Sequence, residues 1–199
     1  MSRHRLPLLT AILAICLQGC ASISNQKPAI DQQARQAEPN IPNIWQLTGK
    51  LGFKSPQKAG SVNLTWHQRD DDYQLKLNGP LGTGSAQITG NKHQIVVTRG
   101  TEQHSGTPEQ IASQWLGVPL PVDAVGWWAR GLPSPNHGAT TNTTLDSAQN
   151  PQSFEQAGWK LSFSNFYIVD QQPLPKKITG QLGDLSFKLV ISKWNLSDN

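Results

Sequence analysis

SVNLTWHQRDDDYQLKLNG, Ser61 to Gly79, decides the fold of this chain, because two alternating segments flank a short turn. Apolar and polar residues alternate through Ser61–Gln68 and again through Tyr73–Gly79, which is the period of a strand with one buried face. Asp70–Asp72 separates them, and it is too short for the crossover that parallel strands need. The stretch therefore predicts an antiparallel hairpin with one face on a core and the other in water.

The same alternation recurs on both sides of this hairpin. Further strands are expected at Ile44–Phe53, Ser85–Gly90, Gln94–Arg99, Gly158–Phe166, Tyr167–Asp170, Lys176–Gln181 and Leu185–Trp194. Gly90 and Asn91 have the composition of a hairpin connection. The polar, Thr- and Asn-rich segment 134–153 is expected to be a connection between the helices and the later strands. The body is therefore predicted to be a strongly curved antiparallel sheet.

Two short helices are expected between the two groups of strands. Thr107 is a helix N-cap, Pro108 takes the first helical position, and Gln110 completes a capping box. A second helix is expected over Val122–Arg130, before Gly131 and Pro133. The apolar faces of both helices need a partner, and the concave side of the sheet is the nearest one. The fold class is mainly β with short helices.

The amino terminus has the pattern of a lipoprotein signal. Arg3 and Arg5 precede an apolar run, Leu6–Leu17, that is short for a membrane span. The following Leu17–Cys20 resembles a bacterial lipobox. Residues 1–19 are therefore expected to be a cleaved signal peptide and Cys20 to be lipidated, which leaves no disulfide in the mature chain. The alternative is an ordinary secretory signal with two incidental cysteines.

The anchor and the segment after it indicate where the protein acts. Diacylation of Cys20, with a third chain on the new amino group, would hold the protein firmly on a membrane. By resemblance to the sorting rule of enterobacterial lipoproteins, Ala21 in place of aspartate indicates the outer membrane, on its periplasmic face. Residues 20–43 are expected to be the lipidated cysteine and a polar tether, and residues 44–199 a single domain.

The charge and the motifs exclude several classes of function. Once Arg3 and Arg5 are removed, 15 basic and 13 acidic residues remain, so the net charge falls from +4 to +2 and indicates no nucleic-acid partner. No phosphate-binding loop or GxSxG elbow is present. The histidines of the mature chain, His67, His93, His104 and His137, lack metal-ligand spacing. No metal, cofactor or catalytic residue is therefore expected, although a Ser/His/Asp set assembled by folding stays open.

Three polar or aromatic groups have competing interpretations. The three aspartates of Asp70–Asp72 favour a solvated turn over a cation site, and Asp123 with Arg130 favours a surface ion pair. Four of the seven tryptophans, Trp45, Trp66, Trp159 and Trp194, fall in strands, where core packing is the default. The other three, Trp115, Trp127 and Trp128, fall on the short helices, where core packing alone explains them less well.

The turn LNGPLGTGSA, Leu77–Ala86, carries a leucine at its tip. In one interpretation Leu81 folds back onto the sheet and packs there. In the other, Pro80 and Gly82 hold Leu81 in an exposed position from which it can enter a membrane. Composition alone favours the first interpretation.

Motifs along nearly the whole chain resemble the LolB family of outer-membrane lipoprotein receptors. They are Asn78–Gly82, Trp115–Pro121, Trp128–Pro133, Leu174–Ile178 and Leu185–Trp194, together with the lipobox. The resemblance implies a half-open antiparallel β-barrel with a helical lid over an apolar cavity. Its turn carries a leucine at the matching place, which favours Pro80, Leu81 and Gly82 as a membrane-insertion loop.

The resemblance also implies a function. A monomeric, non-enzymatic receptor would take lipoproteins from the periplasmic carrier LolA, hold their acyl chains and insert them into outer-membrane lipid without nucleotide hydrolysis. Candidate lining residues of the acyl cavity are Ile111, Trp115, Val125, Trp127 and Trp128, with apolar side chains of the sheet. Two alternatives stay open: a structural accessory lipoprotein of an outer-membrane assembly machine, and an enzyme acting on cell-wall or lipid substrates.

Overall fold

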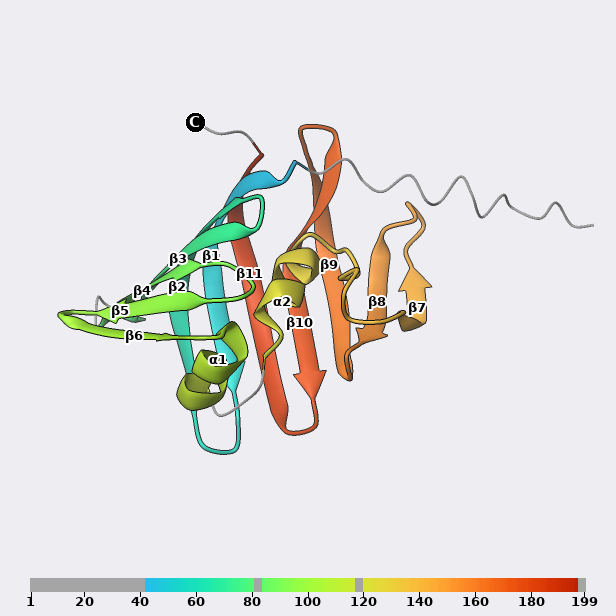
Figure 1. Ribbon diagram of the computed structural model, residues 1–199. Helices are drawn as coiled ribbons and strands as arrows, with labels where there is room; N and C mark the ends of the chain where they lie inside the picture. Colours follow the sequence, from blue (N-terminus) through green and yellow to red (C-terminus); the bar gives the residue numbers. More distant parts are fainter. Residues whose placement is uncertain (1–41, 81–83, 117–119, 197–199) are drawn as a thin grey trace, which may run out of the picture. The chain divides into compact units, whose positions relative to one another are not determined.

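Eleven strands form an open antiparallel sheet in the part of the chain that the structure describes. The computed structural model describes residues 42–80, 84–116 and 120–196 (Figure 1). Cys20, the expected signal and tether, Leu81 and Gly82 lie outside these ranges, and the side chain of Trp115 is not described. Neither described helix is long and apolar enough to cross a membrane.

The elements follow the chain as six strands, two helices and five strands. They are β1 (Ile44–Lys54), β2 (Ala59–Arg69), β3 (Asp72–Asn78), β4 (Ser85–Gly90), β5 (Ile95–Arg99), β6 (Glu102–Gly106), α1 (Pro108–Leu116), α2 (Val122–Ala129), β7 (Thr141–Leu145), β8 (Pro151–Gln156), β9 (Trp159–Val169), β10 (Gln172–Leu182) and β11 (Leu185–Asn195). The order across the sheet is β6-β5-β4-β3-β2-β1-β11-β10-β9-β8-β7.

This strand order places the first and last strands side by side in the middle of the sheet. β1 pairs with β2 on one side and with β11 on the other, both antiparallel. β6 and β7 are therefore the edges, and the segment between them, with α1 and α2, must pass from one edge to the other. It does so across one face of the sheet, as Figure 1 shows. The described fold is thus a half-open barrel with a helical cover, as predicted.

The sequence did not predict the strands β6, β7 and β8. Every residue of β7 is exposed, and β6 is exposed except at its last residue, so neither shows an apolar alternation. β7 lies within the segment 134–153, which the sequence indicates only as a connection, and β8 begins in it and ends at Gln156. The two strands expected at Gly158–Phe166 and Tyr167–Asp170 are one strand, β9, with Asn165 at a φ of +59°.

The predicted local features at the turns and the helix start are confirmed. Asp70 and Asp71 connect β2 to β3, and Asp70 has a φ of +52°, as tight hairpin turns require. At α1 the Thr107 backbone N–H donates to Gln110 Oε1 (3.1 Å), and the Gln110 N–H donates to Thr107 Oγ1 (3.3 Å). These reciprocal bonds satisfy donors that a helix start otherwise leaves unpaired.

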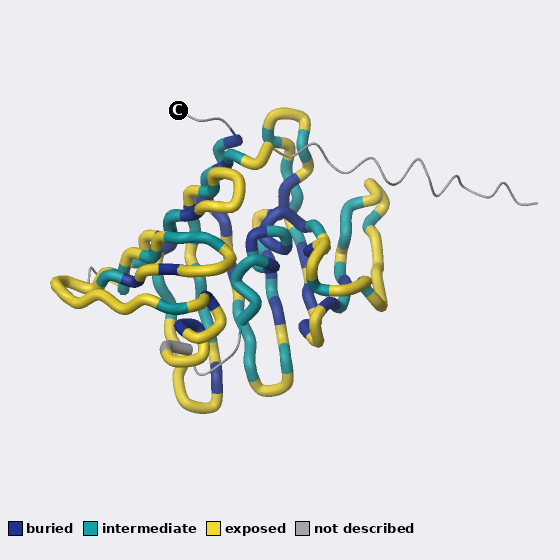
Figure 2. Tube along the Cα trace, viewed as in Figure 1, coloured by how far each residue is buried: buried dark blue, intermediate teal, exposed yellow. Residues whose placement is uncertain are grey.

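The four strand tryptophans pack in the core, as expected. The ring of Trp45 lies 5.2 Å from that of Trp66 and 5.4 Å from that of Trp194, centroid to centroid. Trp159 is 3% exposed and packs against Phe187. Figure 2 shows the buried segments on the central strands and on α2, with exposed residues at the hairpin tips.

A single buried amide attaches the end of α2 to the sheet. Gln156, on β8, is 2% exposed. Its Oε1 accepts hydrogen bonds from Trp128 Nε1 and the Ser134 backbone N–H, both 2.8 Å. Its Nε2 donates to the carbonyl oxygens of Ser134 and Gly138, also at 2.8 Å each. The amide thus uses both donors and both acceptor sites.

Replacing this amide by an apolar side chain is predicted to destabilise the fold. Gln156→Leu keeps the volume but removes four hydrogen bonds, including those from the buried Trp128 Nε1 and Ser134 N–H, so the free energy of unfolding should fall by at least ~2–4 kcal/mol. Equilibrium unfolding in urea, followed by tryptophan fluorescence, measures this. Gln181→Leu, at an exposed position of β10, is the matched control and should change stability by less than about 0.5 kcal/mol. Equal stability of the two variants would contradict the prediction.

Candidate functional site

An apolar cavity of about 430 Å³ lies between the sheet and the two helices. Its sheet side is lined by Leu51, Val62, Leu75, Leu77, Ile88 and Phe187, among others, and its helix side by Ile111, Leu120, Val122 and Val125. The volume falls within the ~300–1,000 Å³ of pockets that bind small molecules. The composition of its walls suits an apolar ligand.

The cavity runs along β3, and the side chains that line its two ends differ in charge. Tyr73, near the start of β3, and Gly79, just after its end, both contribute to the lining. At the ~3.3 Å rise of a strand, the six steps between them span about 20 Å. Three cationic side chains also line the cavity: Lys54, Lys58 and Arg99. The strand registers place all three at the Gly79 end.

The turn between β3 and β4 closes at this cationic end. The Gly79 N–H donates to the Gly84 carbonyl oxygen at 2.9 Å, and both glycines line the cavity. Pro80 is exposed. The remaining candidates for a membrane-insertion loop, Leu81 and Gly82, lie outside the described residues, so their role stays a prediction.

The structure separates the five candidate lining residues on the helices. Ile111 and Val125 line the apolar cavity. Trp128 is fully buried instead, donates to Gln156 and packs 6.2 Å from Trp159. Trp127 lines a second, more polar pocket with Trp45 and Arg130. Their part in binding acyl chains stays a prediction, as does that of Trp115.

Helix geometry explains this separation. Successive residues of an α-helix point about 100° apart, so Val125 and Trp127 point to nearly opposite sides of α2. A short helix with apolar residues on several faces can fill a core and line a cavity at once. The sheet-side residues such as Val62 and Leu77 were expected only as a class, yet the alternation of β2 and β3 already marks their inward positions.

Arg130 is buried, and the expected surface ion pair with Asp123 is wrong. Its guanidinium carbon lies 4.4 Å from the ring centroid of Trp127 and 5.8 Å from that of Trp45. Its Nε donates to the Gly126 carbonyl oxygen at 3.2 Å. Burial lowers the pKa of Arg130 to about 10, so the group stays charged at neutral pH. Two aromatic faces compensate this charge.

Folding does bring a serine, a histidine and an aspartate together. Ser134 Oγ lies 2.9 Å from His137 Nδ1, and His137 Nε2 lies 3.4 Å from Asp123 Oδ1. Ser134 is only 2% exposed, and both of its backbone polar groups bind Gln156. The hydroxyl does not line the apolar cavity. The contacts among Ser134, His137 and Asp123 therefore connect the loop after α2 to the start of that helix.

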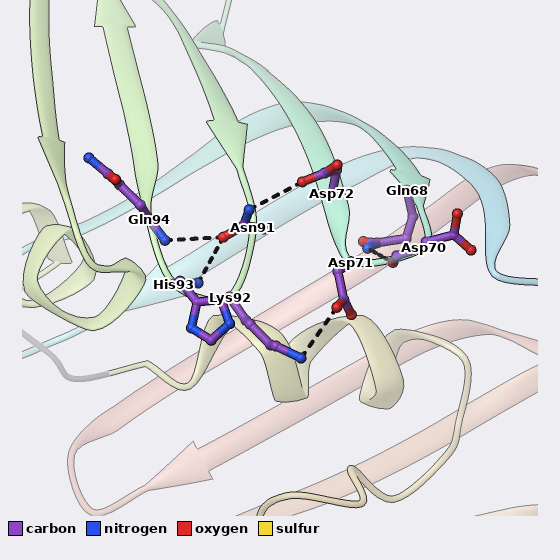
Figure 3. Close-up of polar contacts among 8 residues, drawn as sticks. All are labelled: Gln68, Asp70, Asp71, Asp72, Asn91, Lys92, His93 and Gln94. Atoms are coloured by element: carbon purple, nitrogen blue, oxygen red, sulfur yellow. Dashed lines mark hydrogen bonds and ion pairs between the residues drawn. The ribbon is translucent and has the colours of Figure 1, made fainter.

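The aspartate-rich turn between β2 and β3 contacts the turn between β4 and β5 (Figure 3). Asn91 Nδ2 donates to Asp72 Oδ1 at 3.3 Å, and Lys92 Nζ lies 3.3 Å from Asp71 Oδ2. Asn91 Oδ1 accepts from the backbone N–H groups of His93 and Gln94. Among residues 42–80, 84–116 and 120–196, no group of three or more His, Cys, Asp or Glu side chains could hold a metal ion. These aspartates form an exposed, hydrogen-bonded turn.

Comparison with known sequences places this architecture in a family. The family model described as "Outer membrane lipoprotein LolB" matches residues 43–194. A curated LolB from Pseudomonas fluorescens is 36% identical over 189 residues, covering 92% of this chain and 91% of the relative. One from Cellvibrio japonicus is 36% identical over 200 residues, covering 97% and 98%.

Solved structures show the same fold at low sequence identity. An outer-membrane lipoprotein-sorting protein domain from Vibrio parahaemolyticus superposes with a TM-score of 0.54 at 11% identity, covering 84% of this chain and 91% of that one. A LolA superfamily protein from Nitrosomonas europaea gives a TM-score of 0.53 at 12% identity, covering 80% and 90%.

A charge inside the apolar cavity is predicted to weaken binding of an apolar dye. Val125→Asp places a carboxylate in the lining, and its desolvation by a bound ligand should weaken dye affinity at least about tenfold. Titration of a fluorescent hydrophobic dye measures this. Val190→Asp, on an exposed position of β11 outside the lining, should bind the dye like the wild type. Unchanged affinity of Val125→Asp would show that the dye binds elsewhere.

Proposed function

The chain belongs to the LolB family of outer-membrane lipoproteins, and we propose that it receives lipoproteins from the periplasmic carrier LolA and inserts them into the outer membrane. The observation that carries the proposal is the apolar cavity between sheet and helices, about 430 Å³ in volume. Acyl chains cannot cross water unaided, since each exposed CH₂ costs about 0.8 kcal/mol. A cavity with apolar walls supplies the surroundings that such a cargo needs.

Transfer in this proposal needs no nucleotide hydrolysis. A cargo moves from donor to acceptor when the acceptor binds it more tightly, and only this differential affinity sets the direction. The side chains proposed to hold the acyl chains are the aliphatic residues of β2, β3 and β4 on the sheet side, and Ile111 and Val125 on the helices. The helices serve as a lid, whose opening admits the chains.

The cavity favours this function over a structural accessory lipoprotein. A purely structural subunit gains stability from a filled core, because voids forfeit packing contacts. Here half-buried apolar side chains such as Leu77, Ile88 and Val122 pack against the core on one side and line open space on the other. The protein is proposed to act as a monomer.

The membrane anchor is proposed to be separate from the cavity. Cleavage after residue 19 and lipidation of Cys20 would attach the protein to the periplasmic face of the outer membrane. Residues 21–43 would then connect the anchor to the folded body, whose first strand begins at Ile44. All the described residues that line the cavity come after that point.

The soluble form of the protein is predicted to accept cargo. Cys20→Ala, or replacement of residues 1–20 by a soluble export signal, should give a folded protein that takes lipoprotein from LolA. The measurement is transfer of a lipoprotein from purified LolA, followed by separation of the two carriers. Val125→Asp in the same background is the control and should accept less cargo. A folded soluble form that takes no lipoprotein would refute the proposed function.

Leu81 is predicted to act in delivery and not in acceptance. One leucine that enters hydrocarbon gains about 1.5–3 kcal/mol of transfer free energy. This is enough to orient a tethered body so that the Gly79 end of the cavity faces the membrane. Leu81→Glu should therefore keep acceptance from LolA but block release into liposomes, because a buried carboxylate is costly. Ile168→Glu, an exposed apolar residue (68% exposed) of β9, is the control and should deliver normally. Equal loss of acceptance and delivery would indicate a structural role for Leu81.

A further inference from the structure

The hydroxyl of Tyr73 is buried in the wall of the apolar cavity without a hydrogen-bond partner among the described residues. The side chain is 6% exposed. Buried polar groups are nearly always paired, since losing water without a replacement partner is unfavourable, so an unpaired one needs an explanation. Among the described side chains, Tyr167 is the other case, and it does not line the cavity.

Tyr73 stands where the apolar lining meets polar groups. Its ring packs against Trp66, with centroids 6.1 Å apart. Trp66, Tyr73 and Val122 line both the apolar cavity and a second pocket, whose other walls include Gln68, Asp123 and Arg130. A ligand whose chains fill the cavity would place its polar linkage near this shared wall.

The charged groups near the Tyr73 hydroxyl influence which hydrogen-bond acceptor in a ligand it can bind. Burial, followed by the carboxylates of Glu109 on α1 and Asp123 on α2, raises the pKa of Tyr73. The phenol therefore keeps its proton and remains a donor at physiological pH. The two carboxylates disfavour an anionic acceptor such as a free fatty acid carboxylate. A neutral carbonyl oxygen suits the site better.

We propose that Tyr73 recognises the cargo's acyl linkage: its hydroxyl donates a hydrogen bond to the carbonyl oxygen of the ester or amide that joins an acyl chain to the lipoprotein. This rests on the proposed function, because it assumes that acyl chains enter the cavity. Aliphatic walls alone cannot distinguish an acyl ester from an ether or a hydrocarbon of the same length. The buried hydroxyl supplies that distinction.

Protein atoms bury this hydroxyl in the structure. A ligand carbonyl therefore reaches it only when the groups around it shift. The hydroxyl then gains a hydrogen bond that it lacks among the described residues. Binding of a carbonyl-bearing ligand favours the shifted arrangement by differential affinity.

A pair of lipids that differ only in their carbonyl groups tests the proposal. A diacylglycerol and its diether analogue with the same chains would displace a fluorescent hydrophobic dye from the full chain carrying Cys20→Ala. The wild-type cavity should prefer the ester about threefold to tenfold, the range of one neutral hydrogen bond. Tyr73→Phe should bring this ratio close to one. Tyr167→Phe removes a tyrosine hydroxyl outside the cavity and should keep the preference.

The outcomes separate this inference from the proposed function. If both lipids displace the dye and Tyr73→Phe keeps the ester preference, or lowers both affinities equally, the hydroxyl has no recognition role and the inference is overturned alone. If neither lipid displaces the dye from the wild type, the proposed function fails and the inference fails with it. Thermal unfolding of both tyrosine variants should match the wild type, which shows that the ratio does not report loss of fold.

Discussion

The pairing of β1 with β11 is the constraint on which the rest of the described structure depends. It joins the two ends of the body by an antiparallel ladder in the middle of the sheet, so the chain's midpoint has to bridge the edges β6 and β7. The segment that connects the two edges crosses the face of the sheet, because the apolar faces of α1 and α2 need to be buried and the sheet offers an apolar surface. The cavity exists because this crossing segment covers a curved sheet.

The space beneath the helices is filled unevenly. Large rings gather near α2, where Trp45 packs on both Trp66 and Trp194 and Gly126 lies against Trp66. Farther along β3 the lining is mostly aliphatic, with the rings of Phe53 and Phe187, and it leaves open space. The same interior therefore serves two purposes. The aromatic part holds α2 with the help of Gln156 and Arg130, and the aliphatic part stays available to an apolar ligand.

The two ends of the cavity differ in chemistry, which agrees with the proposed transfer from a carrier to a membrane. The end formed by Gly79 and Gly84 carries lysine and arginine side chains, which are compatible with an anionic lipid surface. The other end carries Tyr73, near two carboxylates. In the proposed function, a neutral, carbonyl-bearing ligand and an anionic surface would thus meet opposite ends of the cavity, about 20 Å apart along β3.

The sequence by itself determined the features that depend on neighbours along the chain. Alternation predicted the central strands, Asp70–Asp72 the tight turn, and Thr107 with Gln110 the helix start, because each rests on contacts a few residues apart. Motifs in order along the chain indicated the LolB family. Only the tertiary structure decided which strands are edges, that Arg130 is buried between two rings, that Val125 and not Trp127 or Trp128 lines the cavity, and that the hydroxyl of Tyr73 has no described partner. These features depend on residues far apart in the chain, and local periodicity carries no information about which distant side chain covers a given atom.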